Sequence, residues 1–287
     1  MKVAFAGLCV MGFPMAGHLA KAGHEVAVFN RSPQKASRWA EVHGGRACAT
    51  AAEAAEDVEV FVLCVGNDDD VRQVTGEALP RMAPGGVVVD HTTTSAVVAR
   101  EMAALAAEGG RAFVDAPVSG GQAGAENGQL TIMCGGAGAA YAKVEPVIGA
   151  YAKATRLMGG PGSGQLTKMV NQICIAGVVQ GLAEGLHFAT RAGLDPAEVY
   201  EAISKGAAQS WQMDNRWKTM SEGRFDFGFA VDWMRKDLGL LLDESRRNGA
   251  KLDMTAMVDG FYAEVQAMGG NRWDTSSLVA RLEKSAR

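Results

Sequence analysis

The sequence has no surplus of positive charge and no long uninterrupted apolar run, and each absence excludes a class of protein. Its 28 Lys and Arg residues are outnumbered by 32 Asp and Glu residues, which gives a net charge of −4. A mildly acidic chain offers no electrostatic footprint for nucleic acid or for an anionic membrane surface. Because no stretch of about 18 consecutive apolar residues is present, we expect neither nucleic acid nor a membrane as a partner.

Paired cysteine motifs are also lacking. The five cysteines are an odd number in a long chain, and no His lies near them in metal-ligand register, so a disulfide framework and a metal site are not expected. We interpret them as small buried hydrophobes in a reducing compartment. The N-terminal apolar run is too short for a signal peptide, and we therefore expect a cytoplasmic protein. The cysteines are Cys9, Cys48, Cys64, Cys134 and Cys174.

Glycine, in contrast, is abundant, with 36 of the 287 residues. The usual share is ~7%, so the excess requires an explanation in backbone geometry. The hydrophobic share of 48% excludes a disordered chain. At roughly 100–200 residues per domain, the length predicts two domains.

The first half of the chain alternates short apolar runs with stretches of helical periodicity. This alternation predicts parallel strands joined by crossover helices, hence a doubly wound α/β sheet of the Rossmann type over residues 1–161. The predicted strands are 3–6, 25–29, 60–65, 87–90, 112–114, 130–134 and 155–157, and the main predicted helices are 11–22, 33–42 and 97–107.

A cluster of glycines at 159–164 separates this half from a region of different texture. Residues 165–191 form a long, mostly apolar run without proline, which predicts a buried helix. No further strand pattern follows, so residues 162–287 are predicted to be an all-helical domain joined to the first by this long helix. The apolar character of the helix favours a homodimer or homotetramer.

The strongest nucleotide-binding signal is Gly7-Leu8-Cys9-Val10-Met11-Gly12. It follows the first predicted strand and opens the first helix, the position of a Gly-x-Gly-x-x-Gly dinucleotide fingerprint. The outer glycines permit the tight turn and the close packing of helix on strand. Cys9 replaces the middle glycine, at which a side chain hinders the approach of a phosphate.

The end of the second predicted strand bears on the choice of cofactor. An NAD-specific site usually places an acidic residue there, on the ribose 2′-hydroxyl. This chain has Asn30 and Arg31 instead, with Lys35 and Arg38 close behind. Arg31 can pair with a 2′-phosphate, which favours NADP over NAD, although NAD remains a possible cofactor. The alternative is an ordinary exposed arginine at a strand end.

Two further segments carry candidate catalytic chemistry. Ser119-Gly120-Gly121 follows the strand ending near Asp115 and offers a hydroxyl and open backbone N–H groups to a carboxylate, unless it is only a flexible loop. Lys168 enters the long apolar helix, where burial disfavours the charged amine and suits it to proton transfer. The alternative is a lysine that extends to solvent from a helix start.

Four motifs, taken in order, resemble the β-hydroxyacid dehydrogenase family over essentially the whole chain. That family includes 3-hydroxyisobutyrate dehydrogenases, tartronate semialdehyde reductases and glyoxylate/succinic semialdehyde reductases. It implies an enzyme that transfers a hydride between NADP(H) and a small carboxylate-bearing β-hydroxy acid or semialdehyde. The motifs are Gly7-Leu8-x-x-Met11-Gly12-x-Pro14-Met15-Ala16, Asp115-x-Pro117-Val118-Ser119-Gly120-Gly121, Gly162-x-Gly164-x-x-x-Lys168-x-x-Asn171 and Lys236-Asp237-Leu238.

The resemblance implies a role for each matching residue. Lys168 would be the general acid/base, Asn171 would orient the substrate or the lysine, and Asp237 is an orienting partner. The substrate would be held by Ser119, Gly120, Gly121, Asn171, Gln172 and Trp211. The cofactor would be held by Gly7, Leu8, Val10, Met11, Gly12, Asn30, Arg31, Val65, Asn67, Thr93 and Lys236. An aromatic residue such as Trp211 on a helical domain is, however, more often part of the core.

Small departures from the family pattern leave other readings open. Gln172 stands where many members have a second Asn, which is similar to the tartronate semialdehyde reductase branch, and Thr92 replaces a common Ser. An imine reductase on the same architecture is disfavoured by Lys168 and by the loop for a carboxylate, which imines lack. A non-catalytic nucleotide-binding protein is disfavoured by Lys168 and by the absence of a basic patch.

Overall fold

The structure is a computed structural model that describes residues 1–284. The chain divides into two compact units, Met1–Lys168 and Met169–Arg287. The sequence analysis places its domain boundary after residue 161, at the turn that precedes the long helix α8 (Ser163–Arg191). Compactness instead assigns the first six residues of α8 to the first unit.

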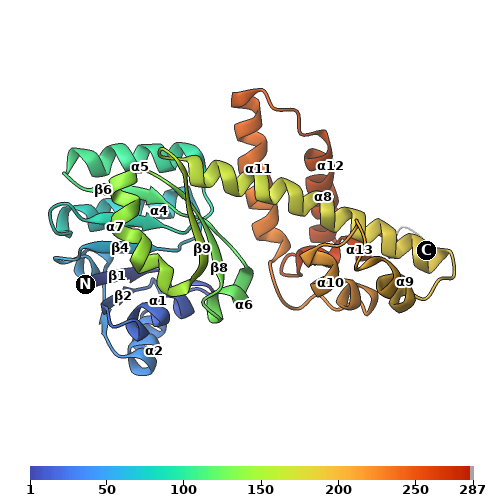
Figure 1. Cartoon of the computed structure of the whole chain (residues 1–287), viewed down its shortest axis with the longest axis horizontal. Helices are drawn as coiled ribbons and strands as arrows, with labels where there is room; N and C mark the ends of the chain where they lie inside the picture. The colour runs from blue at the N-terminus through green and yellow to red at the C-terminus, as the bar shows by residue number, and fades with distance from the viewer. Residues whose placement is uncertain (285–287) are drawn as a thin grey trace. The chain divides into compact units, whose positions relative to one another are not determined.

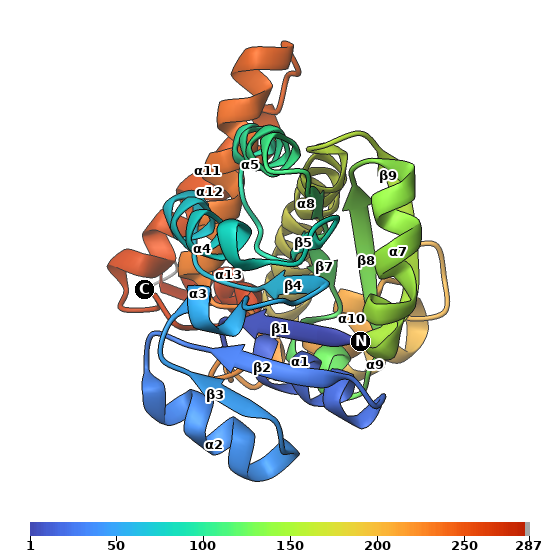
Figure 2. The same ribbon diagram turned by 90° about the vertical axis from the view of Figure 1, so that its left-hand side faces the viewer.

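The first unit contains a nine-stranded sheet with the order β3-β2-β1-β4-β5-β6-β8-β7, and β9 pairs with β8. The first six strands in this order are parallel, as the alternation of apolar runs predicts. Figure 2 shows β3, β2, β1, β4 and β5 side by side. The strands are β1 (Lys2–Ala6), β2 (Glu25–Phe29), β3 (Arg46–Cys48), β4 (Val60–Leu63), β5 (Val87–Asp90), β6 (Ala112–Asp115), β7 (Val118–Ser119), β8 (Leu130–Gly135) and β9 (Ala152–Gly159).

One part of the sheet departs from the all-parallel pattern. Strand β8 is antiparallel to both β6 and β7, whereas β9 returns parallel to β8. The segment between β6 and β8 holds only β7 and the six-residue helix α6 (Gly121–Glu126). This segment holds no full-length crossover helix of the kind that usually joins parallel strands, and the chain turns back here. The fold class is unchanged.

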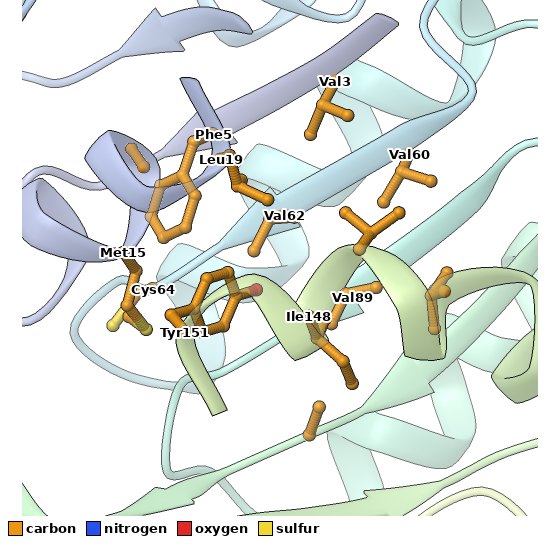
Figure 3. Close-up of a cluster of buried hydrophobic side chains, with 14 of the residues drawn as sticks. Val3, Phe5, Met15, Leu19, Val60, Val62, Cys64, Val89, Ile148 and Tyr151 are labelled. Carbon is orange, nitrogen blue, oxygen red and sulfur yellow. The ribbon is translucent and has the colours of Figure 1, made fainter. Parts of the chain in front are cut away.

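Helices cover both faces of this sheet (Figures 1 and 2). Alternate residues of each strand point to opposite faces, so Val3 and Phe5 pack on one side and Ala4 and Ala6 on the other. Figure 3 shows the first of these two cores, in which Tyr151 and Ile148 lie against the sheet valines. The covering helices are α1 (Gly12–Lys21), α2 (Pro33–His43) and α7 (Gly138–Ile148) on that side, and α3 (Ala51–Ala54), α4 (Asp68–Ala78) and α5 (Ala96–Glu108) on the other.

The second unit is helical, as predicted from the loss of strand patterning. Buried Met234, Leu238 and Leu241 repeat at helical spacing along one face of α11 (Val231–Asn248). A bidentate pair from Arg235 to Asp259, with distances of 3.0 and 3.1 Å, links α11 to α12. The remaining helices are α9 (Pro196–Ile203), α10 (Trp211–Ser221), α12 (Asp253–Ala267) and α13 (Leu278–Lys284).

Helix α8 is the one helix among residues 1–284 with the length and apolar composition of a membrane span. Composition alone is weak grounds for such an assignment, because the core helix of a globular protein has the same features. Several of its apolar side chains are exposed, among them Val170, Val178 and Phe188. The prediction of a buried helix therefore holds only in part among the described residues.

Candidate active site

The glycine-rich turn between β1 and α1 has the geometry that a dinucleotide site requires. Gly7 has a φ of 95°, and a Cβ there would collide with the carbonyl oxygen of Cys64. A Cβ at Gly12 would collide with the carbonyl oxygen of Gly7. Only glycine therefore fits at these two positions, and the chain passes directly from strand to helix. The N-terminus of α1 consequently lies at the carboxyl edge of the sheet, where helix N–H groups favour a phosphate.

Cys9 occupies the middle position of this turn, with its thiol against the start of α1 and against Cys64. Its Sγ accepts the N–H of Gly12 at 3.4 Å and lies 3.8 Å from the Sγ of Cys64. The thiol is thus engaged with the protein, while the residue as a whole is exposed at the turn. The residues of the turn, including Val10 and Met11, fit a dinucleotide. A bound nicotinamide would supply hydride chemistry here.

Asn30 and Arg31 follow β2 and have different surroundings. The side-chain carbonyl of Asn30 accepts the backbone N–H of Leu8 at 2.9 Å, so Asn30 holds the glycine-rich turn in place. Arg31 is 81% exposed and forms an ion pair of 3.2 Å with Asp70. Asp70 is a residue that the sequence analysis missed, and its carboxylate is a partner of the Arg31 guanidinium in this structure.

The turns after β4 and β5 are bonded to one another. The backbone N–H of Val65 donates to the Oγ1 of Thr92 at 3.0 Å. Asn67 caps α4 by accepting the N–H of Asp70 at 2.9 Å, which is a common role for Asn before a helix. Thr93 follows Thr92 in the next turn. The predicted cofactor residues Val65, Asn67 and Thr93 therefore share one edge of the sheet with the glycine-rich turn, because parallel strands end together.

The predicted carboxylate loop is anchored to neighbouring elements on both sides. Ser119 ends β7 and pairs with Thr131 of β8. Gly120 and Gly121 have φ values of 128° and 61°, which few other residues adopt. Helix α6 follows at once, and the ring nitrogen Nε2 of His18 lies 3.0 Å from the carbonyl oxygen of Ala125 at its end. This contact ties the loop to α1.

Lys168 is buried, with 7% of its surface exposed, one turn into α8. The start of α8 is fixed by Asp115, whose two carboxylate oxygens accept the backbone N–H groups of Gly162 and Gln165 at 2.8 and 2.9 Å. The amide of Gln165 bonds to the backbone of Thr92 and Thr94. Local sequence carries no signal for these roles, because the partners are 47 to 73 residues apart.

Two buried carboxyl groups support this edge of the sheet. Burial raises the pKa of Asp90 to about 7 and that of Asp115 to about 6. Within residues 1–284, the Oδ2 atom of Asp90 has no hydrogen-bond partner. Burial likewise lowers the pKa of the neighbouring His91 to about 4, so the ring is neutral and bonds to Ala116 and Tyr151.

The second unit brings several predicted residues into one network of polar side chains. The amide of Asn171 donates to the Oε1 of Gln172 at 2.8 Å, and the amide of Gln172 donates to the Oδ2 of Asp237 at 2.8 Å. Lys236 lies 3.5 Å from the other oxygen of Asp237 and 5.7 Å from the centre of the Trp233 ring. The cation–π partner Trp233 was missed by the sequence analysis.

Trp211 is the first residue of α10 and is 55% exposed. It is therefore not part of the core, where an aromatic residue of a helical domain more often lies. Its ring stacks with the guanidinium of Arg216 at 5.1 Å.

Cys9 and Cys174 are exposed as well, which corrects the expectation that all five cysteines are buried. No group of three or more His, Cys, Asp or Glu side chains in residues 1–284 is arranged to hold a metal ion.

A dinucleotide-binding sheet, a buried lysine at the start of the long helix that follows it and a helical second unit define a class of NAD(P)-dependent oxidoreductases. Comparisons with known proteins agree. A family model described as the NAD binding domain of 6-phosphogluconate dehydrogenase matches residues 2–160. A second, described as NAD-binding of NADP-dependent 3-hydroxyisobutyrate dehydrogenase, matches residues 162–282.

Individual relatives cover nearly the whole chain. An uncharacterized oxidoreductase of Shewanella frigidimarina is 64% identical over 99% of both chains. The 2-hydroxy-3-oxopropionate reductase of Escherichia coli is 34% identical over 100% of this chain and 98% of its own. The structure of 3-hydroxyisobutyrate dehydrogenase from Mycobacterium tuberculosis, solved with L-serine, is similar with a TM-score of 0.90, 30% identity and 98% coverage of both chains.

The chain belongs to the β-hydroxyacid dehydrogenase family, and it is an NAD(P)-dependent oxidoreductase of the 3-hydroxyisobutyrate dehydrogenase type. The family resemblance inferred from the four sequence motifs is thereby confirmed, as is the Rossmann fold followed by a helical domain.

Proposed function

We propose that the protein interconverts a small β-hydroxy acid and its semialdehyde with NADP(H) as the preferred cofactor. The observation that carries this proposal is the bonding of the start of α8, through Gly162 and Gln165, to Asp115 and to the backbone of Thr92. It holds the helix that bears buried Lys168 against the same sheet edge as the glycine-rich turn. A lysine buried at the sheet edge that also carries the dinucleotide turn suits proton transfer.

Lys168 acts as the acid/base in this proposal. In the oxidative direction its neutral amine takes the proton of the substrate hydroxyl as the hydride leaves the carbon. In the reductive direction its ammonium returns a proton to the carbonyl oxygen. The substrate carboxylate binds at Ser119, Gly120 and Gly121, where a hydroxyl and open backbone geometry provide donors.

The second unit supplies substrate and cofactor contacts. Asn171 and Gln172 orient the substrate, and Trp211 lines its pocket. Lys236 reaches the cofactor, with Asp237 holding its ammonium at 3.5 Å. Gln172 is also the feature that favours tartronate semialdehyde, which is another name for 2-hydroxy-3-oxopropionate. The 34% identity to a reductase of that compound supports this choice of substrate.

The preference for NADP rests on Asn30 and Arg31, since no acidic residue follows β2 to repel a 2′-phosphate. The match to a model of NADP-dependent enzymes supports it. We further propose a cytoplasmic location, because all five cysteines are free thiols, as expected in a reducing compartment. A homodimer or homotetramer is proposed from the exposed apolar side chains of α8.

The direct test is a screen of NADPH and NADH oxidation with purified protein. The substrates are tartronate semialdehyde, succinic semialdehyde, methylmalonate semialdehyde and glyoxylate. Matched aldehydes that lack the carboxylate serve as controls, and a cyclic imine tests the imine reductase alternative. We expect turnover with at least one of the acids and poor turnover of the uncharged aldehydes. Equal rates on both sets would contradict the carboxylate loop, and turnover of cyclic imines alone would favour the imine reductase alternative.

A further inference from the structure

Two thiols lie close together at the carboxyl edge of the sheet in the first unit. Strands β1 and β4 are parallel neighbours with Ala6 opposite Leu63, and the N–H of Cys64 donates to the carbonyl of Ala6 at 2.9 Å. Cys64 therefore lies just beyond β4, beside the turn that bears Cys9 just beyond β1. The two Sγ atoms are 3.8 Å apart. Such proximity follows from strand register, not from the 55 residues that separate them in sequence.

The two thiols differ in exposure. Cys9 is exposed at the turn, whereas Cys64 is buried within the hydrophobic core between sheet and helices, as Figure 3 shows. The Cys9 side of the pair therefore faces the surface, and a peroxide from solution approaches the pair from that side. An attacking thiol at the surface with a second thiol behind it is the arrangement of a reactive and a resolving cysteine.

The surroundings of Cys9 also favour its thiolate. The start of α1 directs the N–H of Gly12 at its Sγ, at 3.4 Å, and helix N-termini stabilise negative charge. The hydrogen bond with Cys64 and those backbone N–H groups lower the pKa of Cys9 to about 6, against the opposing effect of burial. Cys174 is equally classed as exposed but lies eleven residues into α8, away from the helix start.

We propose that Cys9 and Cys64 form a thiol oxidation site, in which Cys9 reacts with a hydroperoxide and Cys64 resolves the product to an intramolecular disulfide. The thiolate of Cys9 attacks one peroxide oxygen, the O–O bond breaks, and hydroxide leaves and takes a proton to become water. The sulfur of Cys64 then attacks the sulfenic sulfur of Cys9. The S–O bond breaks, and the hydroxyl leaves as water with the proton of Cys64.

The overall step oxidises two thiols and reduces one hydroperoxide to two molecules of water when the oxidant is hydrogen peroxide. The sulfur atoms must close from 3.8 Å to about 2.05 Å. Because Cys9 lies between Gly7 and Gly12, the disulfide forms within the turn that the proposed function assigns to the cofactor phosphates. This consequence rests on the proposed function: NADPH bound at the turn covers Cys9 and slows its oxidation.

The test treats the full chain with hydrogen peroxide, alkylates the remaining thiols and maps unreduced peptides by mass spectrometry. We expect a Cys9–Cys64 linked peptide that dithiothreitol removes, with Cys48, Cys134 and Cys174 still alkylated after unfolding. Cys64→Ala should trap a sulfenic acid on Cys9 that reacts with dimedone, and Cys9→Ser should give neither product. The matched control Cys174→Ser should form the disulfide as wild type does.

Several results would overturn the proposal. These are oxidation of Cys174 before Cys9, a persistent sulfenic acid on wild-type Cys9, or disulfides that join two chains. The wild-type map decides the matter even if a variant does not fold.

A second arm repeats the oxidation with NADPH at saturation, which its fluorescence reports. We expect the disulfide to form at least about tenfold more slowly. If it forms at the same rate with NADPH bound, the placement of the cofactor on this turn is wrong and the thiol site stands. If no disulfide forms with or without NADPH, the thiol site is wrong and the proposed function is unaffected.

Discussion

The two units hold their functional residues by different means. In the first unit, side chains such as Asp115, Gln165 and Asn30 bond to backbone groups of distant segments, and so they set the path of the chain itself. In the second unit, Gln172 and Asp237 bond to each other across neighbouring helices, and the helix backbones need no such support. Loops at a sheet edge need tertiary bonds to keep one shape, whereas a helix satisfies its own backbone.

The difference teaches where substitutions should matter. A change at a residue that positions the backbone moves several groups at once. A change in a row of hydrogen-bonded side chains on helices moves one side chain. We therefore expect large effects in the first unit and small effects in the second.

The largest effect is expected at Lys168, at the end of the first unit. Lys168→Ala should lower kcat by ~10²–10⁴-fold with NADPH binding retained, because the proton on the substrate oxygen loses its acceptor. Steady-state kinetics and NADPH fluorescence titration measure the two properties. The exposed Lys153→Ala is the matched control and should keep its kcat. A Lys168 variant with more than about a tenth of wild-type kcat would remove the lysine from the mechanism.

A large effect on stability is expected from the buried carboxyl of Asp90. Its pKa is about 7 in the folded protein and ~3.9 when unfolded, so the folded form holds the proton more tightly between these values. The contribution of Asp90 to the free energy of unfolding is therefore largest below about pH 4. It declines as the pH rises to about 7. We expect ~2–4 kcal/mol of decline from Asp90 over that range.

Asp90→Asn should remove most of this decline, since Asn keeps the oxygen that accepts the N–H of Thr92 at 2.9 Å. Urea unfolding at pH 5 and pH 8 measures the free energy of unfolding in both proteins. A smaller slope of the same sign should remain from Asp115, whose pKa of about 6 is also raised by burial. Identical slopes in wild type and Asp90→Asn would show that Asp90 does not titrate in this range.

The third effect concerns the choice of cofactor. Wild type should prefer NADPH over NADH by roughly 10–100-fold in kcat/KM, since an Arg–phosphate pair contributes ~1.5–3 kcal/mol. Asn30→Asp with Arg31→Leu should reverse the order, because the new carboxylate accepts from the ribose hydroxyl and repels a phosphate. The measurement is kcat/KM for both cofactors with one substrate.

Asp70→Asn sharpens this test. It frees Arg31 from its 3.2 Å ion pair, so the preference for NADPH should rise further. A wild type that prefers NADH, or an Asp70 variant that loses its preference for NADPH, would contradict the role of Arg31.

A smaller effect is expected in the carboxylate loop. Ser119→Ala should raise KM for acid substrates by roughly tenfold with kcat little changed, since one charge-assisted hydrogen bond is lost. Its neighbour in the strand pair, Thr131→Ala, is the control and should leave KM unchanged. The same tenfold rise for an aldehyde without a carboxylate would assign Ser119 to another part of the substrate.

The smallest effect is expected in the second unit. Gln172→Ala removes the 2.8 Å hydrogen bond to Asp237 and should raise KM for NADPH by about two- to fivefold, or ~0.5–1 kcal/mol. Asp237→Asn should add little to it in the double variant, because both residues act on Lys236. An effect as large as that of Lys168→Ala would break the proposed contrast between the two units.

The strands and helices of the first unit could largely be predicted from sequence. The predicted strands over 25–29 and 87–90 coincide with β2 and β5, because buried parallel strands are short apolar runs bounded by turns. The short elements β3, β7 and α6 carry too little periodicity to predict. The antiparallel course of β8 also escapes the pattern, since alternation of apolar runs does not report strand direction.

What the sequence determined by itself is the set of local motifs: the glycine-rich turn, the absence of an acidic residue after β2, the Ser119 loop and the lysine in α8. These follow from backbone rules and from order along the chain. Only the tertiary structure decided that Asp115 and Gln165 fix the start of α8, that Asp70 pairs with Arg31 and that Cys9 faces Cys64. The reason is physical, because these contacts join strand ends that are distant in sequence, and strand order and register set them, not local spacing.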